Sequence, residues 1–113
     1  MRFLALISLI ATLAGGSVPA AAQSQQQQNV MTHIGRAVAL NNKCPALKPN
    51  SLIIGMVTRQ RGIAMNRAPY SDIIVAKGGE YAREIAALDT PAACALGRKL
   101  YGPQGEKVPN FLR

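Results

Sequence analysis

The sequence of 113 residues has no tryptophan, one histidine and two cysteines, and only five acidic residues stand against 13 lysines and arginines. These shortages exclude several kinds of site. Nucleophilic catalysis needs a nucleophile beside a base, and a metal site needs clustered His, Cys, Asp or Glu; the sequence has neither pattern. It also has no Gly-x-Ser-x-Gly motif and no phosphate-binding glycine loop. The sequence therefore predicts a non-enzymatic protein with no catalytic residue, metal or cofactor.

Aromatic residues are equally scarce and do not alternate with the basic residues. Those that follow residue 22 are Tyr70, Tyr81, Tyr101 and Phe111. Proteins that hold single-stranded nucleic acid stack its bases on aromatic side chains within a basic groove. We therefore expect no sequence-specific nucleic-acid binding.

Residues 1–22 have the pattern of a cleavable signal peptide. Arg2 precedes an apolar run over residues 3–14, and a run of alanines ends at Ala22. The apolar run is too short to span a bilayer comfortably, and small residues of the kind that a signal peptidase recognises follow it. We expect cleavage after Ala22, export to the periplasm or the exterior, and no transmembrane segment in the mature chain. Loss of Arg2 lowers the net charge from +8 to +7.

The two cysteines of an exported chain have one intramolecular pairing, Cys44 with Cys94. In an oxidising compartment this pairing predicts a disulfide, and closing a loop of about 50 residues stabilises a small domain by about 4 kcal/mol. The alternative is that Cys94 is a thiolate activated by the N-terminus of a helix, in a small thiol-dependent enzyme. We favour the disulfide because no Cys-x-x-Cys motif supplies a resolving partner.

Hydrophobic spacing and capping residues predict helices joined by loops that contain proline. The first begins at Asn29 and repeats apolar residues at Val30, Ile34 and Val38, with His33 solvated on its polar side. Before it, the Gln-rich residues 23–29 are expected to form a disordered leader.

Three more helices are expected, over residues 52–61, 71–88 and 90–101. Residues 52–57 are apolar all round, which indicates a buried central helix or a buried strand, and the flanking caps favour the helix. Gly78 and Gly79 either admit a close neighbouring helix or bend their own helix.

The predicted fold is all-α, a small four-helix bundle-like domain with one disulfide. The helical domain covers residues 30–102, and residues 103–113 form an irregular tail with two prolines in its length. We expect the apolar residues of this tail, Val108, Phe111 and Leu112, to pack against the bundle.

Five basic residues follow or close the second and fourth predicted helices: Arg59, Arg61, Arg67, Arg98 and Lys99. They allow two interpretations. They are either an anion-binding face for lipid phosphate, nucleic acid or a cell-wall polymer, or cations that offset the negative ends of two helices. The second interpretation needs no ligand and is favoured.

The size of the mature chain, its helices and the spacing of Cys44 and Cys94 resemble the periplasmic acid-stress chaperones of the HdeA type. The resemblance implies a protein that opens in acid, exposes apolar surface and holds unfolding client proteins. It carries over no site residues beyond the cysteine pair, which would be a structural disulfide.

The sequence as a whole predicts a small exported helical protein that acts by binding in the bacterial envelope, with a chaperone-like or stress-protective role. Its partner would be a protein or an anionic envelope component, since a basic chain attracts acidic partners. One alternative is a secreted effector of a host-associated bacterium that binds a host partner or an anionic surface. The other is the thiol-dependent enzyme with Cys94 as its nucleophile.

Overall fold

The computed structural model describes residues 24–113, which form four α-helices and no β-strand. The helices are α2 (Gln25–Lys43), α3 (Ser51–Arg61), α4 (Tyr70–Glu84) and α5 (Thr90–Tyr101). The predicted all-α fold with four helices is confirmed. The predicted signal peptide, residues 1–22, lies outside the described residues.

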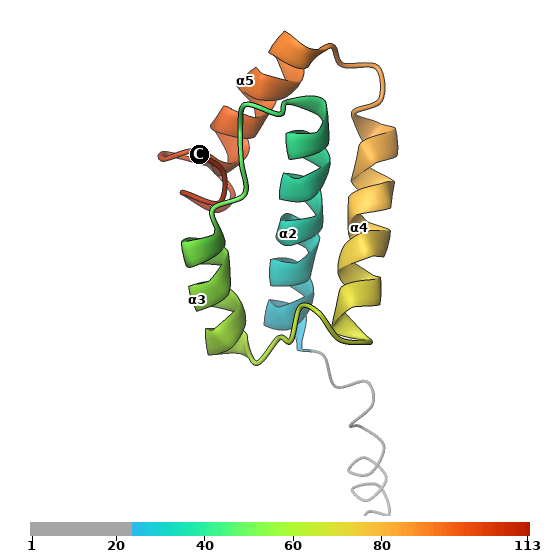
Figure 1. Ribbon diagram of the computed structural model, residues 1–113, viewed down its shortest axis with the longest axis vertical. Helices are drawn as coiled ribbons and strands as arrows, with labels where there is room; N and C mark the ends of the chain where they lie inside the picture. Colours follow the sequence, from blue (N-terminus) through green and yellow to red (C-terminus); the bar gives the residue numbers. More distant parts are fainter. Residues whose placement is uncertain (1–23) are drawn as a thin grey trace, which may run out of the picture.

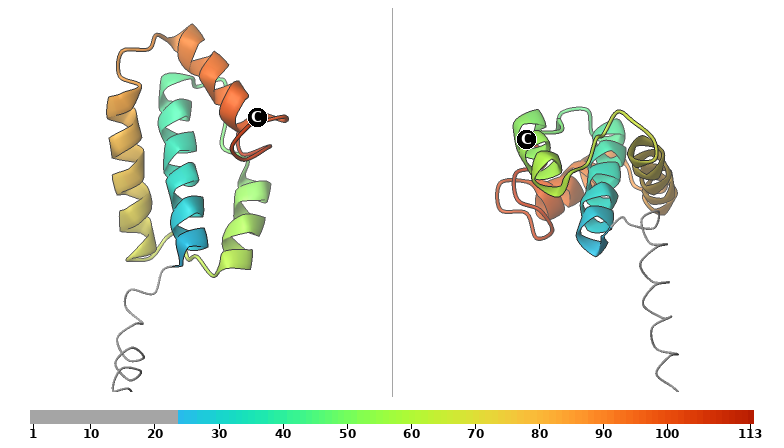
Figure 2. Two further views of the ribbon diagram at one scale, coloured as in Figure 1. Left: turned by 180° about the vertical axis from the view of Figure 1, so that it is seen from behind. Right: turned by 90° about the horizontal axis from the view of Figure 1, so that it is seen from below.

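Helix α2 lies between α3 and α4, and α5 crosses the far end of α2 on one face of this row (Figures 1 and 2). Among these four helices α2 packs against each of the other three, and no other pair is in comparable contact. The central helix is therefore α2.

The glutamine run forms the first turns of α2, so the expected disordered leader is wrong for residues 24–29, the part of it that the structure describes. The predicted start of the helix at Asn29 is wrong as well. Ser24 caps the helix with a reciprocal capping box, in which its hydroxyl accepts from the Gln27 N–H and the Gln27 side chain accepts from the Ser24 N–H. The Gln27 amide also donates to the Arg61 carbonyl at 2.7 Å, and Arg61 donates to the Gln26 side chain at 2.8 Å. These bonds join the start of α2 to the end of α3.

Residues 52–57 are helical as favoured, but α3 is a peripheral helix and its predicted central position is wrong. Asn50 caps its start and Gly62, with a φ of 70°, ends it in the left-handed conformation that suits glycine. Only Ile54 and Thr58 of this helix are buried, and Leu52 is 68% exposed. Its all-round apolar character therefore reflects exposed apolar residues as well as buried ones.

Glycine brings α2 and α4 close together. A Cβ on Gly35 would lie 2.6 Å from the Gly78 nitrogen and 2.8 Å from the Ile74 carbonyl oxygen. Gly78 therefore admits a neighbouring helix, the first of its two predicted roles. A Cβ on Gly79 would meet nothing within 4 Å, so Gly79 takes no part in this crossing.

The disulfide joins Cys44, which follows α2, to Cys94 in α5, with the Cα atoms 5.2 Å apart. The predicted pairing is confirmed. Asp89 caps α5 through its side chain, which accepts from the Ala92 N–H, and Pro91 lies in the first turn of the helix.

The C-terminal tail packs on the bundle as predicted and completes the core. Phe111 and Leu112 are fully buried, and Val108 packs against them as a partly buried residue. Backbone hydrogen bonds between Lys48 and Arg113 hold the tail against the loop that carries Cys44. The rest of the core is a cluster of buried residues from all four helices that includes Ile34, Leu40, Ile54, Tyr81, Ala93 and Tyr101.

We predict that Gly35→Ala lowers the free energy of unfolding by about 1–3 kcal/mol, because the new methyl group has no space against the α4 backbone. Gly79→Ala is the matched control. It adds the same methyl group to open space, and alanine favours a helix over glycine by about 1 kcal/mol. Urea unfolding measures both variants, and a Gly35→Ala protein as stable as Gly79→Ala would contradict the close crossing.

We predict that replacing both Cys44 and Cys94 by alanine lowers the free energy of unfolding by about 4 kcal/mol, because the unfolded chain is no longer crosslinked. Urea unfolding of the oxidised protein and of the double variant gives the difference. Equal midpoints for the two proteins would show that the bond does not stabilise the fold.

Candidate functional site

One side of α2 is covered by no other helix of the described chain. Residues of a helix follow one another at about 100°, so positions on one side recur every three or four residues. Leu40 faces Gly97 of α5, and Gly35 faces Gly78 of α4. Ile34 lies beside Ile54 of α3. Val38 lies between the directions of Ile34 and Gly35, about 160° from Leu40, so it points between α3 and α4 and away from α5. Its side chain is 40% exposed.

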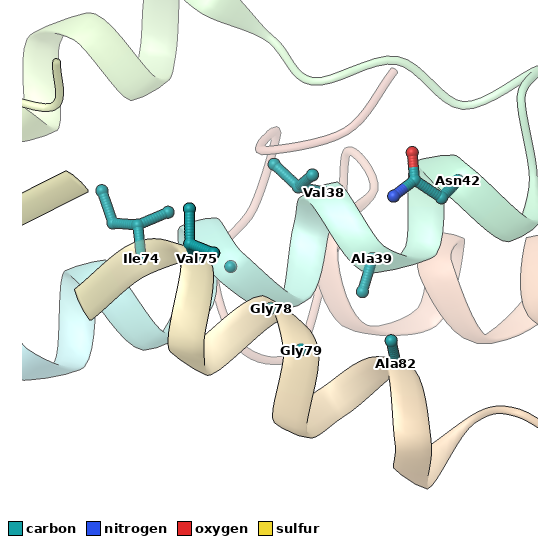
Figure 3. Close-up of a pocket in the computed structure, with 9 residues that line it drawn as sticks. Val38, Ala39, Asn42, Ile74, Val75, Gly78, Gly79 and Ala82 are labelled. Atoms are coloured by element: carbon teal, nitrogen blue, oxygen red, sulfur yellow. The ribbon is translucent and has the colours of Figure 1, made fainter. Parts of the chain in front are cut away.

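An apolar groove of about 340 Å³ runs between Val38 and α4 (Figure 3). Its lining includes Val38, Ala39 and Asn42 of α2, and Ile74, Val75 and Gly79 of α4. Figure 3 shows Ala39 facing Ala82 between the two helices, with the aliphatic side chains of Ile74 and Val75 along one rim. Small residues at the crossing thus leave the groove open instead of filling it.

A second groove of about 210 Å³ lies on the other side of Val38, toward α3. It is lined by Ile34, Val38, Pro49, Ser51, Ile54 and Met65. Neither groove has a charged residue in its lining. We call the surface formed by the two grooves and Val38 between them the open face of α2.

The five basic residues that the sequence offered as an anion-binding face do not come together in one site. Arg59 and Arg61 are in the last turn of α3, and Arg98 and Lys99 are in the last turn of α5. These two helix ends lie apart in the molecule (Figure 1), and Arg67 is in the loop after α3.

The five basic side chains are exposed, and within residues 24–113 none of them has a carboxylate within ion-pair distance. The ion pair of this part of the chain is Lys77 with Glu80, at 4.0 Å. Arg61 bonds to Gln26, which is a structural contact between α2 and α3. In the last turns of α3 and α5, the positive charges oppose the negative end of each helix dipole.

His33 is not the solvated histidine that its position on a polar helix face predicted. Its Nδ1 lies 2.7 Å from the hydroxyl of Tyr101, a fully buried residue of α5, and the two rings meet edge to face. Arg36, one turn further along α2, places its guanidinium 5.1 Å from the ring centre of Tyr81 in α4. This polar cluster inside the bundle was missed because its partners come from three different helices.

Burial and neighbouring charges keep this contact neutral. Desolvation lowers the pKa of His33, and the positive charges of Arg36 and Lys107 lower it further. Burial raises the pKa of Tyr101 to about 12. At neutral pH an uncharged His33 and a protonated Tyr101 hydroxyl therefore share one hydrogen bond, whose direction depends on the tautomer of His33. Tyr101 is fully buried and His33 is partly buried, so the contact joins α2 to α5.

The alternative prediction was that Cys94 is a reactive thiolate. Both sulfur atoms are joined in the disulfide, so Cys94 has no free thiolate in this state. Cys44 is fully buried in the core, which is typical of a structural disulfide.

Comparison of the chain with protein-family models, curated proteins and solved structures gives no match. No helix within residues 24–113 is long and apolar enough to cross a membrane. The open face of α2 is therefore the candidate site on its geometry alone.

The pKa of His33 generates a prediction about acid stability. As pH falls below about 6.5, the unfolded chain binds a proton at this histidine before the folded chain does, since the folded pKa is lower. This histidine therefore favours unfolding progressively from about pH 6.5 downward, until the folded form also binds the proton.

His33→Asn removes this titration and keeps an oxygen that can accept from Tyr101, at a similar helix propensity. We expect the free energy of unfolding of the variant to fall less than that of the wild type between about pH 7 and about pH 5. Urea unfolding over this range measures it. Parallel curves for the two proteins would contradict the shifted pKa.

Proposed function

We propose that the chain is a small exported, non-enzymatic binding protein of the bacterial envelope that holds apolar segments of partner polypeptides on the open face of α2. The observation that carries this proposal is the pair of uncharged grooves on either side of the exposed Val38. Exposed apolar surface rimmed by polar residues marks interaction sites in soluble proteins.

The side chains around the grooves suit segments of variable sequence. Met65 is partly exposed at the rim of the groove toward α3, and methionine adapts its shape to different apolar partners. Gly79 and Ala39 leave room in the other groove for larger side chains of a partner. A surface of this kind favours loose recognition over one tightly specified ligand.

Charge supports an acidic partner. The chain carries a net charge of +8 including Arg2, and its carboxylates neutralise few of its cations by direct pairing within residues 24–113. Long-range attraction would bring acidic polypeptides to the surface, and the uncharged grooves would then take up their apolar side chains.

The disulfide fits a protein that works in an oxidising compartment, and residues 1–22 have the pattern that directs export. Together with the open face, these features support a chaperone-like role in the envelope, in line with the resemblance to proteins of the HdeA type.

A second candidate function is adhesion to an anionic surface, which includes the role of a secreted effector. The observation that favours it is the exposure of Arg59, Arg67, Arg98 and Lys99 without carboxylate partners in the described part of the chain. Such binding would depend on charge and would be weakened strongly by salt.

We predict that the mature, oxidised protein suppresses the aggregation of a reduced, unfolding acidic protein, and that the double variant Val38→Gln/Met65→Gln binds this client about tenfold more weakly. Each of the two residues loses apolar contact area worth about 1 kcal/mol or less. Light scattering of the client against protein concentration measures the effect.

Leu52→Gln is the matched control, since Leu52 is more exposed than Val38 or Met65 and lines neither groove. It should suppress aggregation as the wild type does. Equal loss in both proteins would contradict the open face as the site. Suppression that is unaffected by the groove variant and abolished by about 0.5 M salt would favour the anionic-surface function.

A further inference from the structure

The outer side of α3 carries two exposed apolar residues one turn apart. Leu52 is 68% exposed and Met56 is 41% exposed. At about 100° per residue, each of them lies about 160° from Ile54 and about 120° or more from Thr58, the two buried residues of this helix. Figure 1 shows α3 at one edge of the row of helices, and within residues 24–113 it packs against no helix other than α2. This apolar pair therefore faces outward, and it lines neither groove of the open face.

A positive charge lies beside the apolar pair. Arg59 follows Leu52 by seven positions, so the two residues lie within about 20° of each other around the helix. The Arg59 side chain extends back along α3, because a Cβ on Gly55 would lie 3.5 Å from its Nη1 atom. Gly55 lies between Leu52 and Met56 along the helix axis, so the guanidinium is at the level of the apolar pair.

The charges of the chain are unevenly distributed, and α3 lies in a wholly basic part. Residues 24–71 contain no aspartate or glutamate. The cations of α3 and of the loops on either side of it are all exposed: Lys48, Arg59, Arg61 and Arg67. Three of the five acidic residues are in α4, at the opposite edge of the row (Figure 1), and the other two are Asp89 and Glu106. An anionic plane would therefore attract the α3 edge of the molecule more strongly than the α4 edge.

We propose that the outer side of α3 docks on the surface of an anionic phospholipid bilayer. Leu52 and Met56 enter the boundary between headgroups and acyl chains, and Arg59 binds phosphate groups beside them. Helices that lie in a membrane interface combine an apolar side with cations that attract anionic headgroups. An arginine guanidinium also matches the geometry of phosphate oxygens, which it binds in pairs.

Charge and shape favour a bilayer over other occupants of this surface. A second copy of the chain would bring two basic surfaces together, and their like charges would repel. A partner polypeptide is recognised mainly through anchor residues buried in fitted pockets. Leu52 and Met56 instead project from one side of a helix, and a fluid bilayer interface takes up projecting side chains without a fitted pocket.

The proposal does not rest on client binding at the open face of α2. The apolar pair and Arg59 are not among the residues that line the two grooves, so a bilayer and a client would not compete for the same side chains. Docking through α3 gives the second candidate function, adhesion to an anionic surface, a defined place and an apolar component. A client on the open face would then be held close to the membrane.

Sedimentation of the mature, oxidised protein with vesicles tests the proposal, at about 0.15 M salt. We expect binding to vesicles of equal parts phosphatidylglycerol and phosphatidylcholine, and binding at least about tenfold weaker to phosphatidylcholine alone. Leu52→Gln/Met56→Gln should weaken binding to the anionic vesicles about tenfold or more, because two apolar side chains leave the interface. Val38→Gln is the matched control. Val38 is as exposed as Met56 but lies on the open face, so this variant should bind vesicles as the wild type does.

Removal of single charges tests the orientation. Arg59→Gln should weaken binding to the anionic vesicles about fivefold, since a cation at the headgroups contributes directly to binding. Arg83→Gln removes the same charge from α4 and should weaken binding less than about twofold, because salt screens charges beyond about 8 Å. Equal effects of the two variants would contradict docking through α3.

A fluorescent reporter tests insertion directly, because the sequence has no tryptophan. The emission of Leu52→Trp should shift to the blue when anionic vesicles bind, and that of Val75→Trp, on α4, should not. An unshifted Leu52→Trp emission on bound vesicles would overturn the proposal. So would a wild type that does not bind anionic vesicles, or a Leu52→Gln/Met56→Gln protein that binds them as the wild type does.

The same proteins separate this proposal from the proposed function. Loss of client suppression in Leu52→Gln/Met56→Gln, with vesicle binding unchanged, would assign the outer side of α3 to a partner polypeptide and overturn docking on a membrane. Vesicle binding by a wild type that suppresses no client aggregation would refute the proposed function and support docking through α3.

Discussion

The close crossing of α2 and α4 at Gly35 and Gly78 is the contact on which the arrangement of the helices depends. Because neither residue has a side chain, the two backbones meet directly, and the α4 backbone occupies the space that a Cβ on Gly35 would need. This leaves the opposite side of α2 for α3, and the Leu40 side for α5. A chain of this length can bury only a modest core, so three helices share one central partner instead of closing a full ring around it.

The three peripheral helices are each fastened to α2 by a different kind of interaction. Backbone proximity holds α4, and side-chain amide bonds from the glutamine run hold the end of α3. The disulfide and the contact between His33 and Tyr101 hold α5 at its two ends. These interactions hold α3, α4 and α5 in place without extensive packing between them. An exposed side of α2 at Val38 is the direct consequence of this design.

The helices and the disulfide were predictable because they depend on local signals and on a cysteine count that allows one pairing. The errors arose where tertiary contacts decide. A polar run such as residues 25–28 has nothing to bury and suggests disorder, yet its amides cap α2 and the end of α3. The apolar run of α3 indicated a buried helix. The sequence shows how apolar the segment is, but the number of helices that pack against it decides how much of it is buried, and α3 packs only against α2.

The candidate site was less accessible to sequence reasoning than the fold. The basic residues were located correctly, since they close helices, but whether they converge depends on the crossing angles of α3 and α5. Val38 illustrates the same limit. Its spacing with Val30 and Ile34 predicted one inward stripe, whereas the structure buries Ile34 and exposes Val38, because glycine at position 35 draws α4 to the neighbouring side.

Charge and apolar surface occupy different places on this molecule, and that separation has a physical consequence. Arg59, Arg61, Arg98 and Lys99 lie at the ends of α3 and α5, and the linings of the two grooves are uncharged. Attraction of an acidic partner would therefore act over a Debye length of about 8 Å at physiological salt, before any groove is filled. Release would depend on the apolar contacts, which salt does not screen. Charges inside the grooves would remove this separation between attraction and apolar binding. Each apolar segment that bound there would have to strip water from those charges, which costs free energy.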